Sequence, residues 1–208
     1  MITDAIKCEK CNFPIMYNVE KNKMMCNCEE YKSMEFNNYV PPSWDERFMK
    51  DVYEWSAKSK DPRTKIGAVL VRWDEKDPIS HGYNGFARKV NDDVSERWER
   101  PEKYLWVSHA ESNSILNCAR TGRAAQGTVM YTQGLPCADC ANDIIQAGIV
   151  EVVLHKQWCD YELKFNWDKW LDSGKRSKIK FKEAGIKIRI FDKILHTVGY
   201  LDGKVINV

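Results

Sequence analysis

The order of apolar and polar positions divides the chain into alternating helices and strands. Apolar residues three and four positions apart indicate helices, and short apolar runs between turn residues indicate strands. The expected helices are about 44–60, 109–122, 136–148 and most of 162–184. The expected strands are 65–71, 78–85, 127–133, 150–156 and 186–191. Alternation of these two element types predicts an α/β sandwich.

Residues with known preferences for helix ends mark the boundaries of these helices. Ser43 and Glu46 have the spacing of a capping box, which starts the first helix. Pro136 suits the first turn of its helix, and Gly122 follows the end of another. These signals agree with the apolar periodicity.

Two terminal segments lie outside this alternation. Residues 1–40 have little apolar periodicity, and "YVPPS" at 39–43 is typical of a linker because prolines neither continue a helix nor pair in a strand. We therefore expect a small module at 1–40 and a larger domain at 41–208. In the larger domain, residues 192–208 form a tail with "LDGK" as a plausible turn.

Composition adds limits on partners and location. The 208 residues carry a net charge of only +2, which disfavours a general electrostatic grip on nucleic acid. The first residues lack an apolar signal core, and no apolar run is long enough to cross a membrane. We expect a cytoplasmic protein (in the host cytoplasm if the source is a virus), whose eight cysteines are thiols or metal ligands rather than disulfides.

The best candidate for chemistry is "PCADC" at 136–140. Cys137 and Cys140 fall in the first turn of a helix, where both sulfurs can face one point and free backbone N–H groups favour thiolates. Such a pair is also found in redox sites and in halves of structural zinc sites. No further cysteine or histidine lies close to it in the sequence.

"HAE" at 109–111 starts another predicted helix. His109 and Glu111 would point about 200° apart along a continuous helix, but in a first turn both can reach an ion beyond the terminus. A lone histidine here is also compatible with a capping or core role. Together, His109, Cys137 and Cys140 would leave one coordination position of zinc open, which is the catalytic arrangement.

The combined H-x-E…P-C-x-x-C pattern is the signature of zinc-dependent nucleobase deaminases. Residues about 43–191 resemble the deoxycytidylate (dCMP) deaminase family. The resemblance rests on these stretches: "SKDPRTKIGAVLV", "GYNGF", "HAESNSI", "PCADC" and "IIQAGI". "ERWERPEKYLWV" is similar to bacterial and viral members. The resemblance implies a cytidine deaminase-like α/β/α sandwich with a mixed five-stranded sheet, and an enzyme that converts dCMP to dUMP and ammonia on the route to dTTP.

The resemblance also implies a role for each motif residue. His109, Cys137 and Cys140 hold the catalytic zinc, and water is the fourth ligand. Glu111 takes the proton of this water, which attacks C4 of cytosine, and then delivers protons to N3 and the departing ammonia.

Further residues are expected to contact the nucleotide. Asn84 contacts the sugar, and the backbone of Ala110 contacts the base carbonyl. Lys65 is one of several cations beside the predicted active-site loops, which favour a monophosphate over a free nucleoside. Tyr161 follows a core strand and is a candidate to close over the nucleotide, although it is equally suited to packing.

Regulation and assembly are expected only by resemblance. Family members commonly form homo-oligomers, and some respond to dCTP and dTTP through a loop that often reads "GYNGFPRG". In this chain the loop reads "GYNGFARK", with Ala87 and Lys89 in place of proline and glycine. Control by dCTP and dTTP is therefore a weaker expectation than the activity.

The N-terminal module has four cysteines, Cys8, Cys11, Cys26 and Cys28. Four thiolates complete a tetrahedron, and the loop between the pairs can fold back as a hairpin, so we expect a structural, zinc-ribbon-like site. The tighter spacing of the second pair also allows four ordinary thiols. Zinc would supply folding free energy that so few apolar residues cannot.

Three other functions compete with the dCMP interpretation. The N-terminal module and a basic run at 175–182 would suit a deaminase that edits RNA or DNA, although that run also suits a solvated helix face. The substrate is alternatively dCTP or a 5-substituted dCMP. A catalytically silent nucleotide-sensing or scaffolding protein is disfavoured because Glu111 is present.

Overall fold

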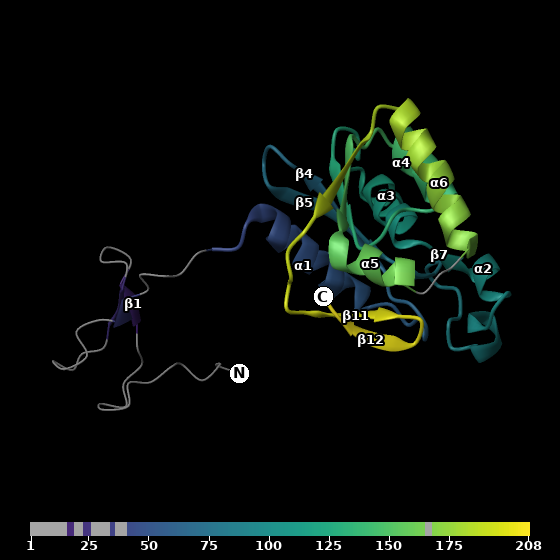
Figure 1. The fold of residues 1–208 in the computed structure, drawn as a ribbon, viewed down its shortest axis with the longest axis horizontal. Coiled ribbons are helices and arrows are strands. Elements are labelled where there is room, and N and C mark those ends of the chain that lie inside the picture. Colours follow the sequence, from purple (N-terminus) through teal and green to yellow (C-terminus); the bar gives the residue numbers. More distant parts are fainter. Residues whose placement is uncertain (1–15, 19–22, 26–33, 36–40, 165–167) are drawn as a thin grey trace. The chain divides into compact units, whose positions relative to one another are not determined.

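The computed structural model describes residues 16–18, 23–25, 34–35, 41–164 and 168–208 (Figure 1). The chain divides into two compact units, residues 1–42 and 43–208. In the first unit, strands β1 (Met16–Asn18), β2 (Lys23–Met25) and β3 (Met34–Glu35) form an antiparallel sheet in the order β1-β2-β3. The four cysteines expected to bind structural zinc lie outside the described residues.

The second unit is built on a mixed five-stranded sheet in the order β10-β9-β8-β4-β5. Its strands are β4 (Gly67–Arg72), β5 (Asp77–Tyr83), β8 (Val129–Thr132), β9 (Glu151–His155) and β10 (Lys187–Phe191). Strands β8, β9 and β10 run parallel, and β4 is antiparallel to both of its neighbours, β8 and β5. The predicted five-stranded α/β sandwich is confirmed.

Helices cover both faces of this sheet. One face packs against α1 (Trp44–Ser56) and α5 (Lys156–Lys164), and the other against α3 (Ala110–Thr121), α4 (Ala138–Gln146) and α6 (Asp168–Glu183). Figure 1 shows α4 beside α6, an arrangement that their contacts support. None of the helices in the described ranges is long and apolar enough to cross a lipid bilayer.

Alternation along β4 explains why its sequence is a continuous apolar run. Val69 and Val71 enter the core beneath α1, whereas Leu70 enters the core beneath α3 and α4. Successive side chains of a strand point to opposite faces, so a strand covered on both faces needs an apolar residue at every position.

The helix ends follow the sequence signals with small differences. The Ser43 hydroxyl accepts a hydrogen bond from the Glu46 N–H at 3.3 Å, which confirms the N-cap of α1. The Glu46 side chain instead pairs with Lys50 at 2.9 Å, and α1 ends at Ser56 rather than near residue 60. Gly122 ends α3 with a φ of 70°, a conformation that glycine adopts without strain.

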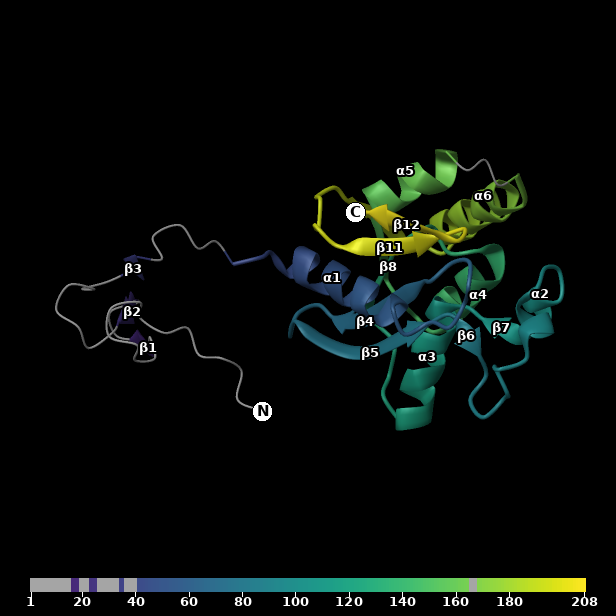
Figure 2. The ribbon, with the colours of Figure 1, turned by 90° about the horizontal axis from the view of Figure 1, so that it is seen from below.

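Several elements were not predicted or were predicted with other bounds. The helical region expected from residue 162 begins earlier, at Lys156, as α5. The tail forms a hairpin of β11 (Val198–Leu201) and β12 (Lys204–Asn207), which encloses the expected "LDGK" turn and lies beside α1 (Figure 2). Between β5 and α3 the chain adds β6 (Gly85–Phe86), a 3₁₀ helix at Ser95–Trp98, α2 (Lys103–Trp106) and β7 (Val107–Ser108).

Candidate active site

Sheet topology brings the sequence motifs to one edge of the sheet. Strands β8 and β9 are parallel, so their carboxyl ends share an edge, and there the chain enters "PCADC" and α4. Because β4 is antiparallel to β8 and β5 to β4, the same edge holds the start of β4 and the end of β5, where "GYNG" lies. The buried amide of Gln133 joins these segments: its Oε1 accepts from the Gly67 N–H at 2.6 Å, and its Nε2 donates to the Lys65 carbonyl at 3.1 Å.

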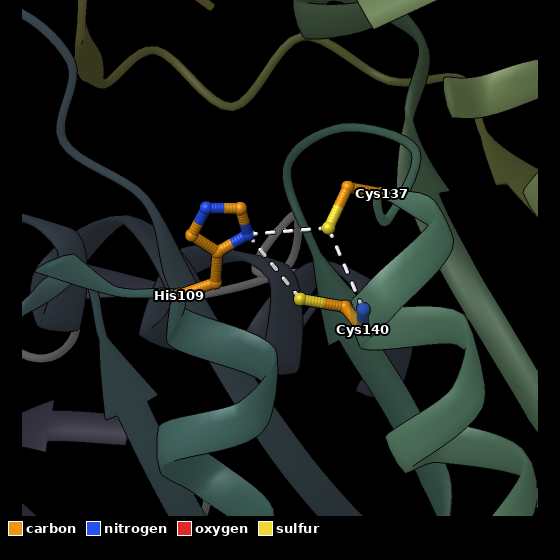
Figure 3. A group of neighbouring side chains, drawn as sticks. All are labelled: His109, Cys137 and Cys140. Atoms are coloured by element: carbon orange, nitrogen blue, oxygen red, sulfur yellow. Dashed lines mark hydrogen bonds between the residues drawn. The ribbon is translucent and has the colours of Figure 1, made fainter. Parts of the chain in front are cut away.

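Two helix N-termini meet at this edge and hold the His–Cys–Cys group, which consists of His109, Cys137 and Cys140 (Figure 3). His109 is the N-cap residue of α3, and Cys137 is the N-cap residue of α4. The His109 Nδ1 atom lies 3.4 Å from the Cys137 sulfur and 3.3 Å from the Cys140 sulfur. The predicted convergence of these residues is confirmed.

The donor set of this group suits zinc. One ring nitrogen and two sulfurs lie within 4.8 Å of one another, as ligands on a common tetrahedral ion do. Cys137 and Cys140 are buried, and the Cys137 sulfur also accepts a hydrogen bond from the Cys140 N–H at 3.4 Å. Three protein ligands leave the fourth position for water or substrate, as in catalytic zinc sites.

The three side chains of the His–Cys–Cys group influence one another's protonation, and the result favours a thiolate at Cys137. A hydrogen bond from the Cys140 thiol lowers the pKa of Cys137 to about 4, and the His109 ring acts in the same direction. The hydrogen bond to Cys137 in turn raises the pKa of His109 to about 9. The pKa of Cys140 is raised because its proton is shared with Cys137. Burial of a thiolate here requires a positive neighbour.

Glu111 lies beside this group in the first turn of α3. It is only 6% exposed, and the Cys140 thiol lies 3.8 Å from its Oε2. Burial raises the pKa of Glu111, which favours proton exchange nearer to neutral pH. The carboxylate is thus close to the metal-binding atoms without being one of them.

A cavity opens onto the His–Cys–Cys group. It is lined by Asp61, Thr64, Ile66, Asn84, Arg100, Lys103, Tyr104, Val107, His109, Ala110, Glu111, Gly134, Leu135, Cys137 and Glu162. The lining therefore contains two members of the His–Cys–Cys group, several carboxylates and two cationic side chains, together with apolar residues. A concave site with convergent polar groups of this kind is typical of small-molecule binding.

A second polar cluster in the cavity, the Asp61 network, consists of Asp61, Asn84 and Lys103. Asp61 is fully buried, and its Oδ2 lies 2.6 Å from the Lys103 Nζ. Its Oδ2 also accepts from the Asn84 Nδ2 at 3.0 Å. The Asn84 Nδ2 donates a second bond to the Thr64 carbonyl at 2.8 Å, and its Oδ1 accepts from the Ile66 N–H at 2.8 Å. These hydrogen bonds identify the oxygen and the nitrogen of the Asn84 amide, because one atom only accepts and the other only donates.

Two of the expected nucleotide contacts line the cavity and two do not. Asn84 and Ala110 line it. The Lys65 ammonium instead turns back to the carbonyl of Ser59, because alternation of extended backbone places Lys65 opposite its cavity-lining neighbours Thr64 and Ile66. Tyr161 lines a different cavity, since it is rotated about 100° around α5 from Glu162. The predicted contacts of Lys65 and Tyr161 with the nucleotide are not supported by this geometry.

Several polar residues of the cavity, among them Asp61, Lys103 and Glu162, were not predicted from the sequence. Asp61 lies within "SKDPR" and Lys103 within "ERPEKY", yet only the folded chain shows that they pair. Glu162 enters from α5, where Trp158 four residues earlier donates its Nε1–H to Glu162 Oε1 at 2.9 Å. The spacing of Trp158 and Glu162 is a helical i, i+4 pair, which is a weak signal without knowledge of the fold.

Comparison with known proteins agrees with this site. The family model for the cytidine and deoxycytidylate deaminase zinc-binding region matches residues 42–156. Human deoxycytidylate deaminase is 35% identical over 156 residues, which are 71% of this chain and 79% of the human protein. A deaminase of Aliivibrio fischeri is 32% identical over 145 residues, which are 70% of this chain and 91% of that protein. The chain belongs to the cytidine and deoxycytidylate deaminase family.

A solved structure supports the same fold. The dCMP deaminase of cyanophage S-TIM5, in complex with dCMP and dUMP, superimposes with a TM-score of 0.53 at 21% identity. The match covers 74% of this chain and all of the cyanophage chain. The cytidine deaminase-like fold is therefore shared, although the sequences have diverged.

Proposed function

We propose that this protein hydrolyses dCMP to dUMP and ammonia and so supplies the precursor of thymidylate in pyrimidine deoxynucleotide metabolism, in the cytoplasm. The observation that carries this proposal is the His–Cys–Cys group with Glu111 beside it, facing one cavity. The relatives named deoxycytidylate deaminase support dCMP as the substrate. When bound, zinc supplies a water nucleophile at neutral pH.

Glu111 moves the protons of the reaction. It accepts a proton from the attacking water, passes it to N3 of the cytosine, and assists protonation of the amino group that leaves as ammonia. The water oxygen first bonds to C4 while one water proton reaches N3, and the C4–N4 bond then breaks as the second water proton reaches the amino group, so atoms and charge balance. Burial of Glu111 supports this role because a raised carboxyl pKa eases transfer in both directions.

Ala110 and Asn84 orient the nucleotide. The Ala110 N–H lies in the first turn of α3, where helix amides have no intrahelical acceptor, and it donates to the base carbonyl. Asn84 contacts the sugar. Both hydrogens of its amide are already used, so Asn84 Oδ1 accepts from a sugar hydroxyl rather than donating to it.

A second zinc ion in the N-terminal module is structural. The support is the sequence pattern of Cys8, Cys11, Cys26 and Cys28, together with the hairpin of β1 and β2 between the two pairs. The ion would stabilise a segment too short to form a core of its own.

The protein acts as a homo-oligomer, and dCTP and dTTP are its candidate effectors. Leu105 and Leu116, which are 83% and 60% exposed, support self-association because large apolar side chains on a surface favour burial. The cavity lined by Tyr83, Phe86 and Arg88 supports an effector site, since it is formed by the "GYNGFARK" loop.

The test is ammonia release by zinc-loaded protein from dCMP, deoxycytidine, dCTP, 5-methyl-dCMP and a short cytosine oligonucleotide. We expect the highest kcat/KM for dCMP. Equal values for dCMP and deoxycytidine would contradict the monophosphate preference. Faster turnover of the oligonucleotide would support an editing enzyme. Faster turnover of dCTP or 5-methyl-dCMP would show that this nucleotide, rather than dCMP, is the substrate.

A further inference from the structure

Glu162 is a carboxylate in the active-site cavity that the family motifs do not include. It lies on α5, six residues beyond the segment that the family model matches. It lines the same cavity as His109 and Cys137, but it belongs to neither the His–Cys–Cys group nor the Asp61 network. Its place in the cavity is therefore explained neither by metal binding nor by the Asp61 network.

Two neighbours hold the Glu162 carboxylate in place. Trp158, which is fully buried, donates its Nε1–H to Glu162 Oε1 at 2.9 Å. Gly134 leaves the space that the carboxylate occupies: a Cβ at this position would lie 2.6 Å from Oε2 and 2.7 Å from Oε1. Glycine at position 134 and tryptophan at position 158 thus fix the carboxylate against the wall formed by the β8–α4 connection.

Stability does not explain a carboxylate at this position. Burial raises the pKa of Glu162 to about 7. The hydrogen bond from Trp158 lowers this pKa, and the negative charge of Glu111 raises it. A buried carboxylate is unfavourable unless it is compensated, and a neutral acceptor would satisfy the Trp158 N–H equally well. A ligand with a hydrogen-bond donor at this point would supply the compensation.

We propose that Glu162 is a specificity-determining residue that accepts a hydrogen bond from the exocyclic amino group of the cytosine. This inference rests on the proposed function. Ala110 at the base carbonyl and Glu111 at N3 both come from α3, so position 4 of the ring faces the β8–α4 wall where Glu162 lies. The amino group is the only hydrogen-bond donor of the cytosine ring system.

The same contact separates substrate from product. After deamination, position 4 carries a carbonyl oxygen, which is an acceptor and is repelled by the ionised form of Glu162. Glu162 therefore favours dCMP over dUMP and aids product release. A hydrogen bond to a charged group changes binding by about tenfold or more, so its loss is measurable.

The test is Glu162→Gln, which keeps an acceptor for Trp158 and adds a donor that the product carbonyl can use. We expect the KM for dCMP to rise about tenfold and the inhibition constant of dUMP to fall. The ratio of the dCMP KM to the dUMP inhibition constant should therefore rise. An unchanged ratio would overturn the proposal. An equal rise of both constants would also overturn it, because it would indicate a packing role only.

A matched control lies on the same helix. Asp160→Asn is the same type of change, but Asp160 is 48% exposed and lines the cavity of Tyr161, so both constants should stay unchanged. Gly134→Ala should shift the ratio in the same direction as Glu162→Gln, since the added methyl group displaces the carboxylate. If wild-type protein deaminates dCMP but Glu162→Gln leaves the ratio unchanged, only this inference fails; if wild-type protein releases no ammonia, the proposed function fails.

Discussion

The His–Cys–Cys group and the Asp61 network line the same cavity but balance their charges in different ways. In the first, two buried sulfurs and a ring nitrogen share protons among themselves at 3.3–3.4 Å. In the second, a buried carboxylate is matched by the Lys103 ammonium at 2.6 Å and by the Asn84 amide. The first region offers ligand atoms to a cation from solution, whereas the second obtains its cation from the chain.

This difference separates chemistry from recognition. A metal-binding region gains its charge balance and its nucleophile together, so loss of the ion removes turnover. A network that is satisfied by protein groups is preorganised before substrate arrives, so its disruption should weaken binding and folding more than the chemical step. This separation predicts effects on turnover that decrease from the metal-binding region to the Asp61 network and then to the N-terminal module.

Among residues that are not ligands of the ion, the largest effect is expected for Glu111→Gln. The amide cannot carry the proton, so kcat for dCMP should fall by about 10²–10⁴, while zinc content and dCMP binding are retained. Ammonia release, metal analysis and equilibrium binding provide the measurements. Glu54→Gln, on the exposed face of α1, is the control and should be fully active. Turnover above about a tenth of wild type would exclude Glu111 as the proton carrier.

Removal of the active-site ion is expected to abolish turnover and to loosen the site. We expect Cys137→Ser to lose this zinc and its activity, because a hydroxyl is a poor replacement for a thiolate ligand. Zinc affinity should also weaken as the pH falls, since protons compete for the ligands. Normal turnover by a Cys137→Ser protein without zinc at this site would contradict the role of the group.

A moderate effect is expected when the Asp61 network is broken. Lys103→Gln leaves the buried Asp61 charge without its ammonium partner, so urea unfolding should show a loss of about 3–5 kcal/mol. KM should rise for dCMP and deoxycytidine alike, with kcat less affected, because the network acts through Asn84.

The exposed pair of Lys60 and Asp92 offers the matched control. Lys60→Gln should leave the urea unfolding curve essentially unchanged, since the Lys60 side chain is 60% exposed and a surface ion pair contributes little. A KM increase for Lys103→Gln that is confined to dCMP would show instead that Lys103 contacts the phosphate. Unchanged stability would mean that the Asp61 network contributes little to the fold.

The smallest effect on turnover is expected in the N-terminal module. Cys8→Ser combined with Cys11→Ser should remove one zinc ion per chain and leave dCMP turnover largely intact. Metal analysis beside ammonia release separates the two sites. If wild-type protein binds only one zinc ion, the structural site is excluded while the active site is unaffected.

Local signals explain which parts of the site could be predicted from the sequence. His109, Cys137 and Gly122 stand at helix ends, and helix ends are marked by the residues beside them. The position of His109, Cys137 and Cys140 at helix starts then predicted that they meet around one ion. The family motifs supplied the role of Glu111, which spacing alone would not reveal.

The remaining parts depend on contacts between distant segments. Asp61 meets Lys103 only because the insertion between β5 and α3 folds back over the cavity. Lys65 and Tyr161 were placed at the cavity from their position in the chain, but side-chain direction along an extended segment and around a helix turned both elsewhere. The position of Glu162 at the cavity depends on where α5 starts. The sequence predicted a helical region from residue 162, whereas α5 begins at Lys156.

The central claim is hydrolysis of dCMP at the His–Cys–Cys group, and reaction in ¹⁸O-labelled water tests it most directly. Zinc-loaded protein is incubated with dCMP in this water, and the product is examined by mass spectrometry while ammonia is measured. We expect dUMP that carries ¹⁸O at C4, one ammonia for each dUMP, and formation of both products slowed by about 10²–10⁴ in Glu111→Gln at the same enzyme concentration. Formation of unlabelled dUMP, or no ammonia from wild-type protein with a full complement of zinc, would contradict the account.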